Sequence, residues 1–169
     1  IRDGQREGSL LSTLDRTVTS TGARLLTDWL ANPLTDLNLI QKRQEAVATL
    51  IDNDGLRATI QTRLKTIYDM ERLLARVSTG RASPRDLSFI GTTLEQLPPL
   101  KTLLEDQPGG LLQELEQSLD VCADLQALLA SALVENCPLQ IRDGGVIQAG
   151  YHEELDQLRQ MSDGGKQWI

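Results

Sequence analysis

Few residues of this chain have the type and spacing that catalysis or metal binding requires. The 169 residues include a single histidine, His152, and two cysteines, Cys122 and Cys137. A zinc site takes four ligands, so these three side chains are too few. The sequence also lacks the glycine-rich Lys-Ser/Thr loop that binds nucleotide phosphates and the His-Glu-x-x-His pattern of zinc hydrolases. We therefore expect no catalytic, cofactor-binding or metal-binding residue here, with His152 on the surface and both cysteines reduced.

Arginine and carboxylate side chains are the other polar groups whose spacing could matter. They fall in two neighbouring blocks, residues 69–76 and 81–87, beside a stripe of apolar residues at helical spacing. One interpretation is a solvated helix face whose ion pairs contribute tenths of a kcal/mol each. The other is a buried or interface network that fixes the orientation of helices. The residues concerned are Glu71, Arg72, Arg76, Arg81, Arg85 and Asp86.

Charge and composition limit the partners of the chain. It carries 24 acidic and 17 basic residues, a net charge of -7, and has no dense run of Lys and Arg. Phosphate backbones are bound through basic clusters, so we expect that this chain does not grip DNA by itself. Its apolar runs fall short of the roughly 20 residues that a membrane span needs, and its first residues do not resemble a signal peptide. The sequence thus predicts a cytoplasmic protein without membrane contact.

The elements that position these residues are predicted to be helices. Aromatic residues make up only 3% of the chain, while leucine and other good helix formers are abundant. Capping residues indicate helix starts at Thr19 or Ser20, at Thr35 or Asp36, and at Ser83 with Pro84. The amphipathic pattern predicts helices over about 9–14, 20–31, 36–51, 56–67, 68–77, 83–104, 111–119 and 125–133, and from 151 onward.

Turn residues separate these helices. Asn53-Asp54-Gly55 predicts a break, and Pro98-Pro99 predicts a bend or an interruption. Residues 141–150 predict one short glycine-rich turn or hairpin. The predicted fold class is therefore all-α, an irregular multi-helix bundle with that turn or hairpin as its one non-helical element. Residues 1–150 would form the helical domain, and residues 151–169 would form the start of a further helix. Because no initiator Met is present, we expect the chain to be a piece of a longer protein.

Three parts of the sequence match patterns of a known family. Residues 15–34 follow D-x-T-x-T-x-x-G-x-R-x-L-x-x-W-L-x-x-P-L at every fixed position. Residues 69–76 look like D-x-E-R-x-x-x-R, and 81–87 look like R-x-x-P-R-D-L. Residues 142–156 are similar to R-D-G-G-V-I-x-x-G-Y-x-x-E-L-D. In this order the chain resembles the MutS family of DNA mismatch repair proteins, with Thr21 a mild departure because many members carry Met there.

This resemblance implies a structural role. The chain looks like the first part of the helical core, or lever, domain, which relays conformational change between the ATPase and the DNA clamp. The resemblance implies ATP and magnesium as cofactors of the parent protein, at a site outside this chain. The partners would be the connector, clamp and ATPase domains, with mismatched DNA reached through a dimeric parent. Residues 151–169 would begin the lever helix that leads to the clamp.

The matching blocks also single out residues with expected structural roles. Asp15, Thr17 and Thr19 would satisfy backbone donors where a helix begins. Arg24 would pair with a carboxylate or with carbonyl groups, and Trp29 would lie in the core. The match favours the network interpretation of the arginines and carboxylates. The full set is Asp15, Thr17, Thr19, Gly22, Arg24, Trp29, Pro33, Glu71, Arg72, Arg76, Arg85, Asp86, Asp143, Gly144, Gly145, Gly150 and Tyr151.

Alternative functions stay open. A MutS paralogue that does not act in mismatch repair would share these blocks. A helical protein-interaction module would use an exposed leucine face, and a small acid/base enzyme would need a suitable pocket.

The helix from Tyr151 is expected to be the least stable part of the chain. Its apolar stripe consists only of Leu155, Leu158 and Met161, and Gly164-Gly165 should interrupt it. Trp168 beyond it would be exposed or buried by a neighbouring molecule.

Overall fold

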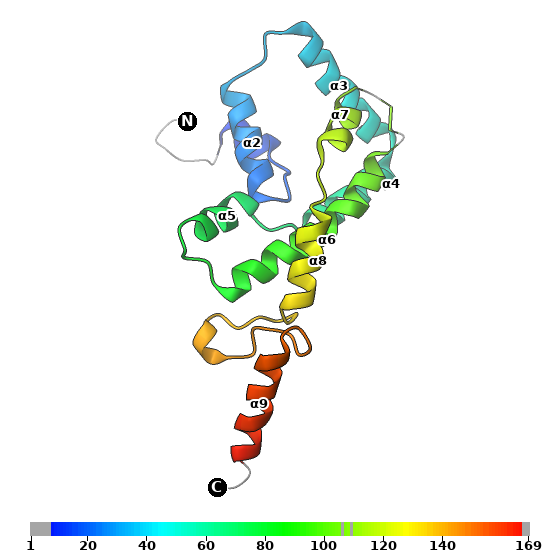
Figure 1. Cartoon of the computed structure of the whole chain (residues 1–169). Coiled ribbons are helices and arrows are strands. Elements are labelled where there is room, and N and C mark those ends of the chain that lie inside the picture. Colours follow the sequence, from blue (N-terminus) through cyan, green and yellow to red (C-terminus); the bar gives the residue numbers. More distant parts are fainter. Residues whose placement is uncertain (1–7, 106, 109, 167–169) are drawn as a thin grey trace. The chain divides into compact units, whose positions relative to one another are not determined.

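The computed structural model describes residues 8–105, 107–108 and 110–166, and these residues form helices joined by turns and loops (Figure 1). The all-α prediction is confirmed. The chain divides into two compact units. The first unit comprises Ile1–Arg72 with Thr92–Val121, and the second comprises Leu73–Gly91 with Cys122–Ile169. Helices α5 (Met70–Ser78) and α6 (Pro84–Leu104) contribute residues to both.

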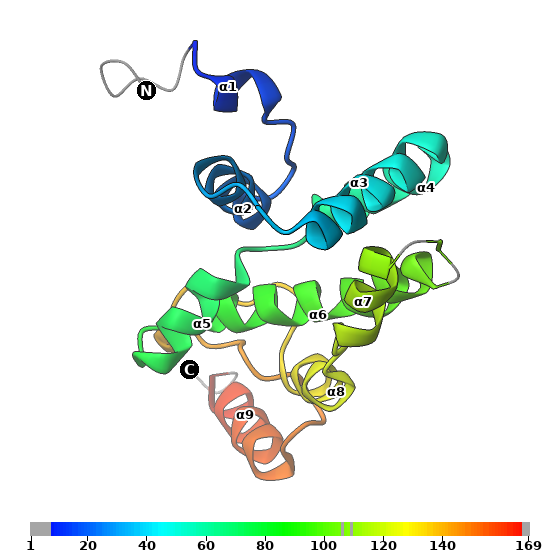
Figure 2. The same ribbon diagram turned by 90° about the horizontal axis from the view of Figure 1, so that it is seen from above.

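The first unit is a set of helices around a small aliphatic core. Besides parts of α5 and α6, it holds α1 (Leu10–Leu14), α2 (Ser20–Ala31), α3 (Leu37–Asp52), α4 (Asp54–Leu64) and α7 (Gly110–Ser118). Helix α3 packs against α4 and α7 (Figure 1, Figure 2). The buried apolar side chains come from four helices and are Ala46, Leu56, Leu94, Leu100 and Leu112.

The helix starts in this unit follow the capping rules. Thr19 is the N-cap of α2, and its Oγ1 accepts a hydrogen bond from the backbone N–H of Gly22 at 3.0 Å. Asp36 caps α3 in the same way, as one of the two predicted residues. Between α3 and α4 the break is shorter than predicted, because Asn53 alone separates them and caps α4. Asp54 and Gly55 already belong to the first turn of α4.

Helix α6 continues through Pro98 and Pro99 to Leu104, so the two prolines do not interrupt it. A proline inside a helix removes one backbone hydrogen bond and crowds the preceding turn. Here Leu94 precedes the prolines and Leu100 follows them, and both are buried. Tertiary packing on both sides therefore keeps the helical path, as it commonly overrides local propensity.

The second unit combines parts of α5 and α6 with α8 (Ala123–Ala132), the short 3-10 helix η2 (Ile141–Asp143) and α9 (Glu153–Lys166). Its buried apolar side chains include Leu73 on α5 and Ile90 on α6. Helix α6 approaches α8 at Gly91, where a Cβ would lie 3.6 Å from Cβ of Leu129. This is ordinary contact, so the two helices are closely packed at that point.

The glycine-rich segment 141–150 does not pair with itself as a hairpin would. Ile141–Asp143 form η2, and Gly144, Gly145 and Gly150 have positive φ angles. Ile147 forms an isolated antiparallel bridge with Leu133, which follows α8. The predicted hairpin is therefore not found. Residues 146–148 pair instead with residues 132–134 at the end of α8, which lie outside the glycine-rich segment.

Several apolar residues of the amphipathic helices are exposed. On α3, Leu37, Val47 and Ile51 are exposed, while the small Ala46 is buried. An amphipathic pattern indicates a helix, but it does not specify which of its apolar residues contacts a neighbour. Contiguous exposed apolar surface usually marks a place where another protein element binds. Separately, none of the described helices is long and apolar enough to span a membrane.

Helix α9 is longer than predicted. It remains helical through Gly164 and Gly165 to Lys166, so these glycines do not interrupt it. Leu158 and Met161 are exposed and Leu155 is half-buried. Trp168, whose contacts were predicted, lies outside the described residues. The low stability of this helix remains a prediction.

Candidate functional site: two arginine–carboxylate clusters

The first cluster joins α2 to the start of α5 within the first unit. Arg24 on α2 holds the Asp69 carboxylate with two hydrogen bonds, from Nη1 at 2.7 Å and from Nη2 at 2.9 Å. Nη2 also donates to Oε2 of Glu71 at 2.6 Å, and the Ser20 hydroxyl donates to Asp69 at 3.1 Å. Paired hydrogen bonds of this kind fix direction as well as distance. We call Ser20, Arg24, Asp69, Glu71 and Arg72 the Asp69 cluster.

These contacts favour the charged form of Asp69. Hydrogen bonds from Arg24 hold the pKa of Asp69 well below its ordinary value, against the opposing effect of desolvation. The hydrogen bonds to Asp69 and Glu71 raise the pKa of Arg24 in turn. The side chain of Asp69 is 15% exposed and that of Arg24 39%, so solvent screens part of the interaction.

The residues before Arg24 form local hydrogen bonds that fix the start of α2. The Asp15 carboxylate accepts hydrogen bonds from both the backbone N–H (2.9 Å) and the hydroxyl (2.6 Å) of Thr17. Thr19 then caps the helix by accepting from Gly22. A Cβ at position 22 would lie 2.8 Å from Thr19 Oγ1, closer than real Cβ contacts come. Glycine at this position therefore leaves room for the capping hydroxyl, and the cap sets the turn from which Arg24 projects.

The second cluster joins the end of α5 to the start of α6 within the second unit. Arg76 Nη2 donates to Oδ1 of Asp86 at 2.7 Å. Oδ2 of Asp86 accepts from the backbone N–H (2.9 Å) and the hydroxyl (3.0 Å) of Ser83. The Ser83 hydroxyl accepts from the backbone N–H of Asp86 in return, which is the reciprocal arrangement of a capping box. We call Arg76, Ser83 and Asp86 the Asp86 cluster.

The Asp86 carboxylate is less solvated than most surface carboxylates. Desolvation alone would raise its pKa and is the largest single effect. The hydrogen bonds from Ser83 and Arg76 together outweigh desolvation, so the pKa of Asp86 lies below its ordinary value. Asp86 is therefore ionised near neutral pH and holds the two helix ends together.

A third set of contacts fixes the base of α9. Asp156 accepts a hydrogen bond from the backbone N–H of Gly150 at 2.7 Å and pairs with Arg159 at 3.1 Å. Arg159 also donates to the carbonyl of Ile147 at 2.9 Å. The first turns of α9 are thus connected to the glycine-rich segment, close to the exposed Tyr151.

Of the remaining residues singled out by the sequence, Arg72 lies at the edge of the Asp69 cluster and the others lie outside both clusters. Arg85 donates from Nε to the Cys137 carbonyl at 3.4 Å, and Arg72 is exposed with a 3.3 Å contact to Asp69. Asp143 lies in η2, followed by Gly144 and Gly145, and Pro33 follows the end of α2.

The histidine and the cysteines have ordinary structural surroundings. His152 is exposed, as predicted, and Nδ1 accepts from the backbone N–H of Leu155 at the start of α9. Neither Cys122 nor Cys137 forms a disulfide within the described residues. Burial raises the pKa of the Cys137 thiol, which donates to the Val134 carbonyl. The described residues contain no group of three or more His, Cys, Asp or Glu placed to hold a metal ion.

Sequence reasoning missed the central position of Asp69 and the roles of Asp156 and Arg159. The first residue of the 69–76 block is Asp69 itself, so a signal was present but was not used. Arg24 was expected to find a carboxylate, yet nothing local identifies one 45 residues away. Asp156 ends the block 142–156, and its spacing of six residues from Gly150 does not correspond to a common capping pattern.

Trp29 was predicted to lie in the core, and this prediction is wrong. Its side chain is 37% exposed, and the guanidinium carbon of Arg43 on α3 lies 3.5 Å from the centre of its ring. The neighbouring Leu25 and Leu30 are exposed as well. The helical stripe of α2 therefore has more apolar residues than the neighbouring helices of its unit cover.

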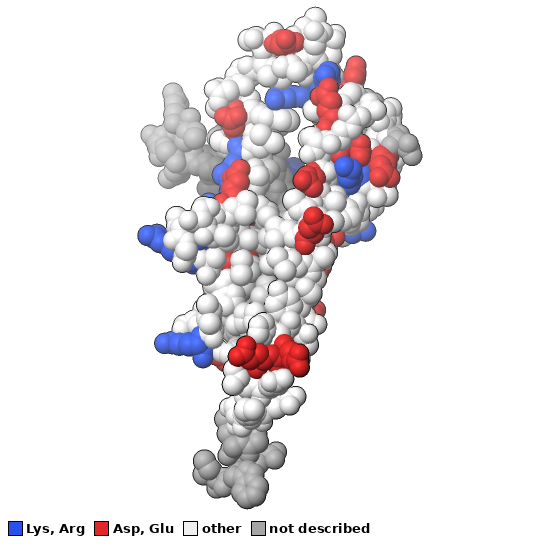
Figure 3. Space-filling view, in the orientation of Figure 1, with Lys and Arg blue, Asp and Glu red and all other residues white. Residues whose placement is uncertain are grey.

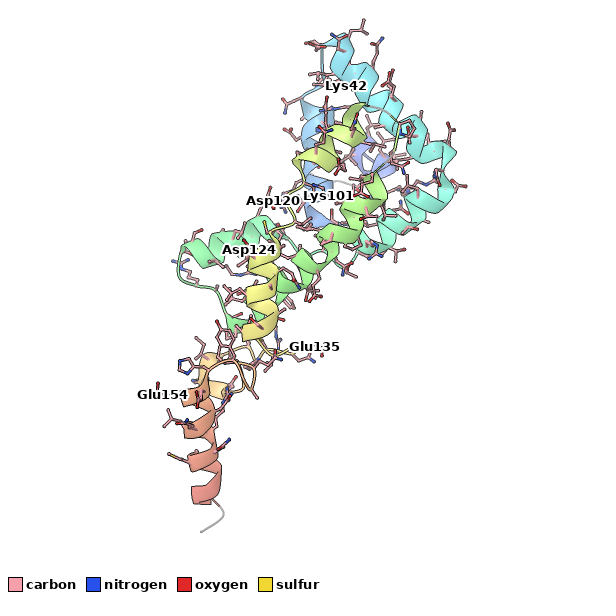
Figure 4. All side chains as sticks on the ribbon, turned by 45° about the vertical axis from the view of Figure 1, so that its right-hand side comes forward. Lys42, Lys101, Asp120, Asp124, Glu135 and Glu154 are labelled. Carbon is pink, nitrogen blue, oxygen red and sulfur yellow. The ribbon has the colours of Figure 1, made fainter. Side chains whose placement is uncertain are left out.

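Two lysines of the first unit lie beside acidic side chains. Lys42 on α3 pairs with Glu114, and Lys101 on α6 donates to the Leu119 carbonyl at 3.0 Å and lies 3.7 Å from Glu116 (Figure 4). On the face shown in Figure 3, acidic and basic side chains alternate over α3 and α7. This surface is unlike the basic clusters through which proteins bind phosphate backbones.

The helices and their clusters define an all-α structural domain in which the strongest polar contacts join helix ends. The chain belongs to the MutS domain III family, whose model matches residues 1–163. A protein named DNA mismatch repair protein MutS from Rhodopirellula baltica is 48% identical over the full chain. Proteins of the same name from an Exiguobacterium strain and from Streptococcus mutans are 45% and 42% identical over 99% of it. The chain covers 19% of the first of these relatives and 20% of the other two, about a fifth of their length.

Proposed function

We propose that this chain is the core, or lever, domain of a DNA mismatch recognition ATPase, and that it relays conformational change between the ATPase and the DNA clamp. The family match and the names of the relatives support mismatch repair over a paralogue with another role. ATP and magnesium would bind in the parent protein outside this chain. The connector, clamp and ATPase domains would be its neighbours, in a cytoplasmic and dimeric parent that contacts mismatched DNA.

The observation that carries this proposal is the fixation of α5 at both ends. Its first turn is held to α2 by the Asp69 cluster, and its last turn is held to α6 by the Asp86 cluster. Charge-assisted hydrogen bonds at both ends restrict sliding and rotation of the helix. A helix restrained in this way passes on a displacement better than one held by apolar contacts alone.

The test measures coupling in the full-length protein with Asp69→Asn and Arg76→Gln variants. The expected result is that each variant still binds mismatched DNA, while the ratio of its dissociation rates in ATP and in ADP moves toward one. Glu95→Gln is the matched control, since Glu95 is an exposed carboxylate on α6 outside both clusters. Coupling equal to that of the wild type in both cluster variants would refute the relay.

The isolated chain provides a second test. It should neither hydrolyse ATP nor prefer a G·T mismatch over matched duplex at physiological salt, because of its net charge of -7 and its lack of a phosphate-binding loop. Hydrolysis that survives repurification, or a measurable mismatch preference, would contradict the assignment of both activities to other domains.

A further inference from the structure

Trp29 lies at the edge of a cavity that the described part of the first unit leaves open. The cavity has a volume of about 170 Å3. Its apolar lining comes from four places: α2, the loop that follows it, α3 and α7. The side chains are Trp29, Leu34, Leu39 and Leu111. Cavities of about 150 Å3 with apolar walls take up a group as large as benzene. This cavity therefore has room for one large apolar side chain.

The rim of the cavity carries the guanidinium group of Arg43, which can still donate hydrogen bonds. Arg43 lies over the Trp29 ring, and no carboxylate among the described residues forms an ion pair with it. Stacking on an aromatic ring orients a guanidinium and leaves its edge able to bind a carboxylate. Lys42, the other cation at the rim, is already paired with Glu114. Among the described residues, the rim thus presents one cation outside an ion pair, Arg43, beside an apolar cavity.

We propose that this cavity is the docking site of another segment of the same polypeptide, which inserts a large apolar side chain into it and pairs an Asp or Glu with Arg43. A helix would present these two side chains one turn apart, since residues three or four positions apart lie about 5–6 Å from each other. The relatives are about five times as long as this chain, so a polypeptide of that length has further segments that can bind at this cavity. The inference rests on the proposed place of this chain as one domain of that longer protein.

Charge argues against a nucleic acid at this site. Glu114 lines the cavity, and Asp28 lies next to Trp29 in the sequence. Glu114 is already paired with Lys42, so the described residues at the rim form no basic cluster for a phosphate backbone, while a protein segment can place one carboxylate at Arg43 and apolar groups elsewhere.

The test places the photo-cross-linking residue p-benzoylphenylalanine at position 39 of the full-length protein. Leu39 lines the cavity and is exposed, and Gln41 on the same helix is an exposed control that points to a different side. We expect an intramolecular cross-link from position 39 to a peptide outside these 169 residues, with an Asp or Glu within four residues of a large apolar residue. The control position should not give this product.

The charge contact is tested by Arg43→Glu in the same experiment. The cross-linking yield at position 39 should fall about tenfold, because two like charges would then face each other. Changing the partner carboxylate to Arg should restore the yield, which separates a lost contact from a misfolded domain. A cross-link to a second copy or to DNA, equal yields at positions 39 and 41, or a yield insensitive to Arg43→Glu would each overturn the proposal. None of these outcomes bears on the coupling measured with the Asp69→Asn variant, so the relay and the docking site are tested independently.

Discussion

The Asp69 cluster joins side chains that are 45 to 49 positions apart, whereas Arg76 and Asp86 are only 10 positions apart. Closing the longer loop costs about 1 kcal/mol more chain entropy. The Asp86 cluster needs only α5, a turn and the first turn of α6. The Asp69 cluster needs α2 to be packed already. The same chemistry thus stabilises a local turn in one unit and a tertiary contact in the other.

The largest effect should come from removing the acceptor of the tertiary contact. Asp69→Ala leaves Arg24 without its two-bond partner and frees Ser20 and Arg72 as well. We expect the fall in Tm to be about twice that of Asp86→Ala, because Asp69 accepts two hydrogen bonds from a guanidinium and Asp86 accepts one. Thermal unfolding followed by circular dichroism measures both, with Glu95→Gln as the control. A larger fall for Asp86→Ala would reverse the ranking of the clusters.

Acid should weaken both clusters. The pKa values of Asp69 and Asp86 are lowered by folding, so the native state binds fewer protons than the unfolded state in acid. Their stabilisation is complete above the unfolded pKa of about 3.9 and is lost as the pH falls below it toward the folded pKa values. Urea unfolding between pH 7 and pH 2 should show a smaller loss for Asp69→Asn than for the wild type. Equal losses would show that this carboxylate does not contribute through its charge.

The cap of α2 tests how the tertiary contact depends on local structure. Thr19→Ala should cost about 0.5–2 kcal/mol. Gly22→Ala should also destabilise, although alanine favours a helix interior by about 0.5–1 kcal/mol, because its Cβ would crowd Thr19 Oγ1. With Thr19 already replaced by alanine, Gly22→Ala should become neutral or stabilising. Additive free energies of unfolding across this double-mutant cycle would show that the close approach has no energetic effect.

The smallest effect should come from the peripheral arginine. Arg72→Gln should change the free energy of unfolding by less than about 0.5 kcal/mol, since its side chain is 72% exposed and its contact to Asp69 is 3.3 Å long. Arg24→Gln provides the comparison in the same chemical denaturation series. Similar losses for the two arginines would mean that geometry at Asp69 does not determine the strength of the cluster.

The local parts of this fold could be predicted from the sequence, and the tertiary parts could not. The helix starts were predicted to within one residue, at Thr19 or Ser20, at Thr35 or Asp36 and at Ser83, because a cap is a relation between residues three positions apart. The reciprocal Ser83–Asp86 contact has the same short range. The sequence could indicate that Arg24 has an acidic partner, but nothing in the residues around Arg24 points to Asp69.

Burial was the least predictable property. Trp29 has the type and spacing of a core residue, yet it faces a cavity at the surface of its unit. The same pattern arises whether a stripe is covered by its own domain or by another part of a longer protein. The path of α6 through two prolines could not be predicted either, since it depends on packing by Leu94 and Leu100.

The two prolines in α6 also determine where this helix is mechanically compliant. Neither Pro98 nor Pro99 has an amide hydrogen, so two successive rungs of the backbone ladder that would end at the carbonyls of Leu94 and Glu95 are absent. The backbone hydrogen bonds before and after this gap are therefore expected to show different amide exchange rates. If α6 bends, most of the bending should therefore occur over residues 94–99, while the capped first turn at Ser83 stays rigid. An otherwise stiff element would thus contain one soft section, and its position is set by two adjacent residues.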